Sequence, residues 1–214
     1  MLDTVLLDLD GTILDTTPLI LTSLRHATRT VLGRVPADAD LIRHFGRTLE
    51  ESLRALAPEI EAARFDALLA TYLAHNRAQH DSLVRLVPGA DEALRGFHQR
   101  GLQLGVVTSK RRDLARHGLE LFGLDSLLAT VVAREDTDQH KPHPAPVIEA
   151  LKRLQASPRR ALFIGDSPYD MQSGRAAGVR VWGLAHNTHP EEELLQAGAE
   201  RVARHWATLI RWMG

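Results

Sequence analysis

The segment Thr4–Thr12, which reads TVLLDLDGT, decides the fold of this chain. Its beginning, Thr4–Leu9, is rich in branched aliphatic side chains and predicts a buried β-strand. Because side chains two apart on a strand share a face, Asp8 and Asp10 project together where the strand ends. Gly11 then allows a sharp turn and a close approach of the backbone to a ligand. Two carboxylates held together in this way are costly unless they serve a function.

The composition of the chain is that of an ordinary soluble globular protein. Its 214 residues are 44% hydrophobic and 25% charged, and the net charge is -1. This near-neutral balance gives no support for binding to nucleic acid or to a membrane surface. No apolar stretch is long enough to span a bilayer and acids interrupt the N-terminal apolar run, so we expect a cytoplasmic protein without a signal peptide. The absence of cysteine excludes disulfides and thiolate chemistry.

The pattern of apolar residues changes along the chain. Residues 18–85 show helical spacing without a convincing strand. From residue 87 onward strands and helices alternate, which predicts an α/β fold, a Rossmann-like parallel sheet with helices on both faces. The expected strands after the first are 102–108, 128–133, 161–165 and 179–183, and the expected helices are 91–100, 113–121, 145–155, 169–177 and 191–197.

The first strand belongs to the later sheet although the helical stretch separates them. We therefore expect a catalytic core made of residues 1–14 and 86–214. Residues 15–85 are expected to form an all-helical cap domain inserted after the first strand. An insertion beside a strand end lies over the site, where it can act as a lid.

Polar side chains follow several of the expected strands. Thr108 and Ser109 follow the second strand, and Asp166 follows the fourth, with Asp170 four residues beyond it. Lys141 lies in the loop after the third strand. Because ligands bind at the carboxyl ends of parallel strands, we expect all of these side chains to meet Asp8 and Asp10 at one edge of the sheet.

This set of residue types points to phosphoryl transfer. Several carboxylates without cysteine suit a hard cation, and Mg²⁺ fits better than zinc. A hydroxyl, backbone N–H groups and a lysine suit phosphoryl oxygens. With charge offset by a metal and a lysine, one carboxylate can attack phosphorus and a second can move a proton to the leaving oxygen.

The order of these elements resembles the haloacid dehalogenase superfamily in its phosphatase branch. The motifs that carry the resemblance are Asp8-x-Asp10-Gly11-Thr12, Thr108-Ser109, Lys141-Pro142 and Gly165-Asp166-Ser167-x-x-Asp170. The inserted helices and the stretch Gly178–Leu184 resemble the subfamily that contains phosphoglycolate phosphatases. The resemblance covers the whole chain.

The resemblance implies a role for each acid. Asp8 is expected to be the nucleophile that becomes an aspartyl phosphate. Asp10 is expected to protonate the leaving group and later to activate water. Mg²⁺ would be held by the side chains of Asp8 and Asp166 and by the carbonyl of Asp10, with Asp170 supporting it through water.

The resemblance also implies where the phosphoryl group is held. Thr108 and the Ser109 amide are expected to bind its oxygens, together with the turn at Gly11 and Thr12. Lys141 is expected to neutralise the nucleophile and the phosphoryl group. The adjacent Lys110 is expected to be solvated rather than catalytic.

The expected substrate is a small anionic phosphorylated metabolite, a phosphomonoester such as phosphoglycolate. Arg43 and Arg47 of the helical segment could contact its anionic part, and the stretch Gly46-Arg47-Thr48-Leu49 resembles that of phosphoglycolate phosphatases and related pyrophosphatases. An inorganic pyrophosphatase of the same branch is therefore the first alternative. The partners expected are this metabolite alone, with the chain a monomer or a homodimer.

Other members of the superfamily fit less well. Dehalogenases generally lack the second acid, which is present here as Asp10. Hexose-phosphate mutases typically carry valine at the position of Thr12 and a histidine near the position of Ile20. A phosphate-binding protein without catalysis would usually lose one of the acids, and a signalling receiver domain is shorter and has no helical insertion.

Overall fold

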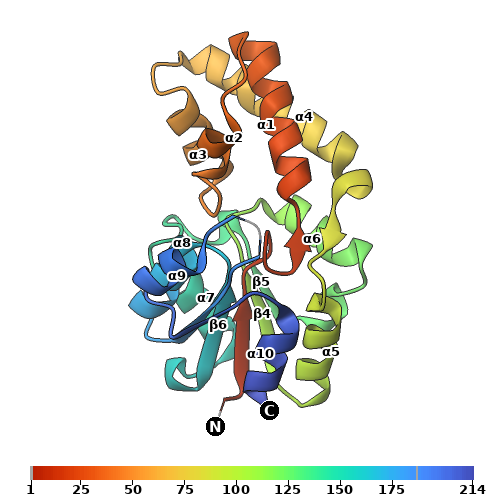
Figure 1. Cartoon of the computed structure of the whole chain (residues 1–214), viewed down its shortest axis with the longest axis vertical. Coiled ribbons are helices and arrows are strands. Elements are labelled where there is room, and N and C mark those ends of the chain that lie inside the picture. The colour runs from red at the N-terminus through yellow and green to blue at the C-terminus, as the bar shows by residue number, and fades with distance from the viewer. Residues whose placement is uncertain (1, 187) are drawn as a thin grey trace.

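The computed structural model describes residues 2–186 and 188–214 and confirms the α/β prediction. Its centre is a parallel six-stranded sheet in the order β5-β4-β1-β6-β7-β8 (Figure 1). The strands are β1 (Thr4–Leu7), β4 (Gln103–Val107), β5 (Thr130–Val132), β6 (Ala161–Gly165), β7 (Arg180–Leu184) and β8 (Arg201–Ala203). The strand that carries the first acid motif is therefore central, between β4 and β6.

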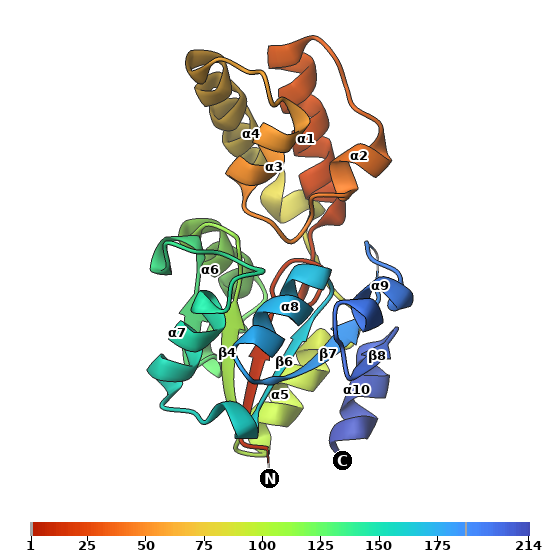
Figure 2. The ribbon, with the colours of Figure 1, turned by 90° about the vertical axis from the view of Figure 1, so that its left-hand side faces the viewer.

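Both faces of the sheet are buried, as the apolar runs of its strands require. Val5 and Leu7 of β1 join one core cluster, whereas Leu6 between them joins the other. The first face is covered by α5 (Ala90–Gln99), α6 (Arg112–Leu121) and α10 (Trp206–Met213), and the second by α7 (Ala145–Leu154), α8 (Pro168–Ala176) and α9 (Glu191–Gln196) (Figure 2). In the described part of the chain, no helix is both long and apolar enough to cross a bilayer.

Four further helices stand beyond the carboxyl ends of the strands (Figures 1 and 2). They are α1 (Thr17–Leu32), α2 (Asp38–Ile42), α3 (Leu49–Leu56) and α4 (Ala62–Leu83). Leu24, Phe65 and Leu68 belong to a core cluster of their own, separate from the two sheet layers. The chain enters and leaves this inserted helical segment through an antiparallel pair of two-residue strands, β2 (Leu14–Asp15) and β3 (Arg85–Leu86).

The structure adds elements that the sequence patterns did not predict. Strand β8 is three residues long and α10 has eight residues, so neither gave a clear periodic signal. Trp206 of α10 is fully buried, and its Nε1 donates to the carbonyl of Thr12 at 2.9 Å. The predicted strand 128–133 is shorter in the structure, where β5 covers Thr130–Val132 and a 3₁₀ turn, Asp125–Leu127, precedes it.

Candidate active site

The predicted site residues meet at the carboxyl ends of β1, β4 and β6. The strand ladders extend one residue past β1 and β4: the Asp8 amide donates to Ile164 and the Thr108 amide to Val132, each at 2.9 Å. A cavity of about 100 Å³ lies between this edge and the inserted helices, and Asp8, Asp10, Gly11, Thr108, Ser109, Lys141, Asp166 and Arg47 all line it.

Lys141 is the centre of the hydrogen-bond network. Its Nζ donates to Asp8 Oδ1 and to Asp170 Oδ1, each at 2.6 Å, and to the carbonyl of Val107 at 3.2 Å. These three bonds use all three N–H groups of the ammonium. Because Lys141 is only 2% exposed, its position relative to the Asp8 carboxylate is fixed.

Asp170 is held by the start of α8 as well as by the lysine. Ser167 is the N-cap of that helix, and its amide and hydroxyl donate to Asp170 Oδ2 at 3.0 and 2.6 Å. This reciprocal capping box satisfies amides at the helix start. Asp170 is fully buried and does not line the cavity, and the supporting role expected for it stays a prediction.

Asp166 is oriented by two threonines from distant parts of the chain. Thr12 donates to its Oδ1 at 3.3 Å and Thr188 donates to its Oδ2 at 3.0 Å. Thr12 is fully buried and its hydroxyl is engaged by Asp166, while the phosphate-binding role of this residue stays a prediction. Gly11 has φ +84, and a Cβ there would overlap the Asp166 carboxylate.

The carboxylates of Asp8, Asp166 and Asp170 repel one another because they are buried and close together. Burial is the main reason that the pKa of Asp8 rises from 3.8 to about 7, with Lys141 opposing the rise and Asp170 adding to it. Burial, followed by the charges of Asp8 and Asp170, likewise raises the pKa of Asp166. Burial alone would lower the pKa of Lys141, but Asp170 and Asp8 more than compensate and raise it.

This acidic cluster has the donor set of a hard metal site. Asp8, Asp166 and Asp170 each offer a carboxylate oxygen, and these oxygens lie within 4.8 Å of one another. Three carboxylates face the single ammonium of Lys141, so the ionised cluster carries a surplus of two negative charges that a divalent cation would balance. Oxygen ligands without nitrogen or sulfur suit Mg²⁺. The residues present therefore fit the ion that the sequence predicted.

The prediction that Lys110 is solvated was wrong. Its side chain is 8% exposed, and its Nζ donates to Asp10 Oδ1 at 2.8 Å. The Lys110 amide also donates to Thr108 Oγ1 at 3.1 Å. The sequence signal for this contact was the position of Lys110 directly after the Thr108-Ser109 pair at a strand end.

The inserted helical segment contacts the edge of the site through the loop before α3. Ser109 Oγ donates to the carbonyl of Gly46 at 3.0 Å. Arg47 Nε donates to the hydroxyl of Tyr169 at 2.7 Å, and its guanidinium lies over that ring at 5.1 Å from the centroid. Arg47 lines the cavity as expected, but Arg43 is mostly exposed beside Asp40 and does not.

The wall of the cavity that the helical segment provides is largely apolar. Ile20, Leu24 and Leu41 line it, together with Tyr72 and Asn76 of α4. Asn76 Nδ2 donates to the Tyr72 hydroxyl at 3.3 Å, and burial raises the pKa of that hydroxyl. The sequence analysis did not identify these two residues, nor Thr188, because each lies far along the chain from the motifs.

Comparison with known proteins gives a consistent result. The sequence pattern of the family described as Haloacid dehalogenase-like hydrolase matches residues 5–184. The pyrophosphatase PpaX of Halalkalibacterium halodurans is 34% identical over 213 residues, which is 100% of this chain and 97% of that protein. PpaX of Anoxybacillus flavithermus is 35% identical with the same coverage. A crystal structure described as a predicted phosphoglycolate phosphatase from Haemophilus somnus has the same fold, with a TM-score of 0.93, 22% identity and coverage of 100% of this chain and 98% of that one.

Proposed function

The chain belongs to the haloacid dehalogenase-like hydrolases, and from this premise we propose that it is a Mg²⁺-dependent phosphatase that hydrolyses a small anionic phosphomonoester through an aspartyl phosphate on Asp8. The observation that carries the proposal is the contact of Lys141 with Asp8 and Asp170, each at 2.6 Å, beside Asp166. This arrangement holds a buried carboxylate in the lining of the cavity with its charge partly offset, as a nucleophile toward phosphorus requires.

In the first step an oxygen of Asp8 attacks phosphorus while the bond from phosphorus to the leaving oxygen breaks. Asp10 lies two residues beyond the nucleophile and lines the same cavity. It donates its proton to the leaving oxygen, which departs as an alcohol. The bond from Lys110 to Asp10 at 2.8 Å orients that carboxyl group.

In the second step Asp10 takes a proton from water, and the water oxygen attacks phosphorus of the aspartyl phosphate. The bond from phosphorus to the Asp8 oxygen breaks, which releases inorganic phosphate and restores both carboxyl groups. Thr108 and the Ser109 amide lie at the end of β4, where they can donate to phosphoryl oxygens.

The residues that would hold Mg²⁺ are Asp8 and Asp166, with the carbonyl of Asp10 and with Asp170 as support. The ion would supply positive charge that stabilises the phosphoryl oxygens. Thr12 and Thr188 orient the Asp166 carboxylate toward the proposed metal position through the hydrogen bonds that they donate to it. Lys141 limits the repulsion between Asp8 and Asp170 whether or not the ion is bound.

The helical segment would act as the cap that selects the substrate. Its loop reaches the site through Gly46 and Arg47. The cavity beneath it is small, about 100 Å³, and combines apolar residues with Arg47 and Lys110. This lining favours a small metabolite that has both a carbon skeleton and an anionic group.

Pyrophosphate is the second candidate substrate. The name of the 34% identical relative, pyrophosphatase PpaX, favours it. The same nucleophile would attack one phosphorus, and the second phosphate would be the leaving group. Pyrophosphate has no apolar part, so it would leave Ile20, Leu24 and Leu41 without a partner.

A substrate panel with Mg²⁺ separates the candidates. We expect phosphate release from phosphoglycolate or a related small acid phosphate, and a phosphoenzyme that hydroxylamine cleaves. Asp8→Asn should abolish both, and Asp66→Asn, an exposed position on α4, should change neither. Preference for pyrophosphate would select the second candidate, whereas sugar phosphates as the only substrates, or full activity of Asp8→Asn, would contradict the proposal.

A further inference from the structure

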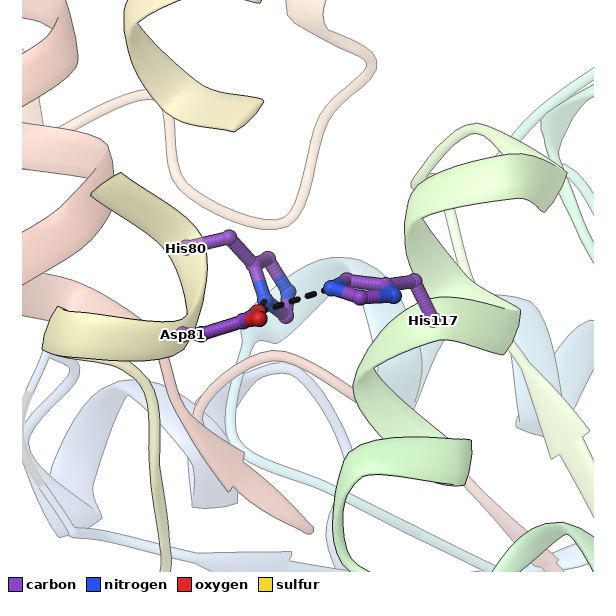
Figure 3. Close-up of side chains that lie close together, drawn as sticks. All are labelled: His80, Asp81 and His117. Carbon is purple, nitrogen blue, oxygen red and sulfur yellow. Dashed lines mark hydrogen bonds and ion pairs between the residues drawn. The ribbon is translucent and has the colours of Figure 1, made fainter. Parts of the chain in front are cut away.

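A second cluster of metal-ligand side chains lies outside the catalytic cavity, between α4 and α6. His80 and Asp81 come from the last turn of α4, and His117 comes from α6 (Figure 3). Asp81 Oδ1 is 3.0 Å from His80 Nδ1 and 2.7 Å from His117 Nε2. The carboxylate oxygen therefore sits between two imidazole rings that belong to different parts of the fold.

The cluster is closed on one side and open on the other. His80 is only 1% exposed and holds its ring within the interface between the two helices. The side chains of Asp81 and His117 are 61% and 49% exposed, which leaves one side of the cluster open to water.

The buried imidazole is incompletely satisfied. His80 Nε2 has no hydrogen-bond partner among the described residues. A Cβ built at Gly118 of α6 would lie 3.5 Å from it, so the ring packs in ordinary contact with that helix. The ring nitrogen that faces the Asp81 carboxylate is the other one, Nδ1, so Nδ1 is the candidate ligand atom.

We propose that His80, Asp81 and His117 bind a transition-metal ion of the Zn²⁺ type. Their ligand atoms all lie within 4.8 Å of one another. Around a tetrahedral zinc with bonds of about 2.1 Å, neighbouring ligand atoms are roughly 3.4 Å apart. The observed separations of 3.0 and 2.7 Å would need to open by about 0.4 and about 0.7 Å. Water from the open side would complete the four ligands.

The chemistry of this site differs from that of the acidic cluster. Two imidazoles and one carboxylate suit zinc, whereas the three carboxylates around Asp8 suit Mg²⁺. The proposed ion would also join two layers of the fold. α4 belongs to the inserted helical segment, whereas α6 covers one face of the sheet. An ion pair of Arg77 with Asp113 already links the same two helices.

The test is a calorimetric titration of metal-free protein with ZnCl₂ in the presence of saturating Mg²⁺, which occupies the carboxylates around Asp8. We expect one Zn²⁺ per chain and a higher melting temperature. His117→Ala and Asp81→Asn should each weaken binding at least about tenfold. Both positions are exposed, so these variants should fold, and His98→Ala, at an exposed histidine of α5, is the matched control.

Two results would overturn the proposal. One is the absence of Zn²⁺ binding at micromolar concentrations, which would leave the cluster as a hydrogen-bonded contact only. The other is unchanged binding by His117→Ala and Asp81→Asn, which would mean that the ion is held elsewhere. Phosphatase activity with Mg²⁺ should be the same in both variants as in the unmodified chain, so this test and that of the proposed function can fail independently.

Discussion

Replacing Asp166 by asparagine should stabilise the metal-free protein while abolishing its response to Mg²⁺. Asp166 is 6% exposed and shares its surroundings with Asp8 and Asp170. Asparagine has the same shape and keeps hydrogen-bonding atoms for Thr12 and Thr188, but it removes the charge. The substitution therefore relieves repulsion in the folded state and removes a metal ligand at once.

The size of the gain follows from the charges nearby. Asp166 faces two carboxylates with oxygens within 4.8 Å of its own, and the ammonium of Lys141 bonds to both of them, which leaves one net negative charge. At an effective dielectric constant near 20, one charge at this separation costs about 3 kcal/mol. Weaker bonds from the two threonines offset about 1 kcal/mol of this. The net gain of about 2 kcal/mol at pH 8 corresponds to a rise in melting temperature of about 4–8 °C for a chain of this size.

The gain should depend on pH. Because the pKa of Asp166 is raised in the folded state, the unmodified protein loses stability as the pH rises above about 4, where the unfolded carboxyl group ionises first. At pH 5 the unmodified cluster can relieve its repulsion by binding protons. The advantage of asparagine should then fall below about 1 kcal/mol.

Thermal unfolding in EDTA and in Mg²⁺, at pH 5 and pH 8, measures all of these effects. Mg²⁺ should raise the melting temperature of the unmodified protein at pH 8 and leave that of Asp166→Asn unchanged. Asp66→Asn, on the exposed surface of α4, should behave as the unmodified protein does. If Asp166→Asn melts at a lower temperature than the unmodified protein in EDTA at pH 8, the reasoning from charge repulsion is refuted.

Three further substitutions test the network around the site. Lys141→Met should cost about 3–5 kcal/mol in urea unfolding, because two buried carboxylates lose their partner; an unchanged midpoint would contradict this. Lys110→Gln should lower kcat about tenfold by freeing Asp10, with a change in stability under about 1 kcal/mol; unaltered kinetics would leave Lys110 without a positioning role. Trp206→Phe should cost about 1–3 kcal/mol, measured by calorimetry, since the buried carbonyl of Thr12 loses its donor; equal melting temperatures would argue against that bond.

Local patterns were enough to predict most of the fold. The apolar strand before Asp8 and the alternation after residue 87 predicted the parallel sheet, because buried strands and amphipathic helices have distinct periods. The helical spacing of residues 18–85 predicted the inserted helices. The patterns did not reveal β8, the strand pair β2 and β3, or α10, since elements this short are stabilised by the neighbours against which they pack.

The candidate site also combines features that the sequence predicts with contacts that only the fold brings about. By itself the sequence determined which chemical groups are available and at which strand ends they stand, because carboxyl ends of parallel strands share one edge. Only the tertiary structure decided that Lys110 bonds to Asp10, that Thr188 bonds to Asp166 and that His117 meets Asp81. Each of these contacts joins residues on separate elements, and no local pattern encodes the distance between them. That distance depends on how the helices pack on the sheet, which the whole chain determines together.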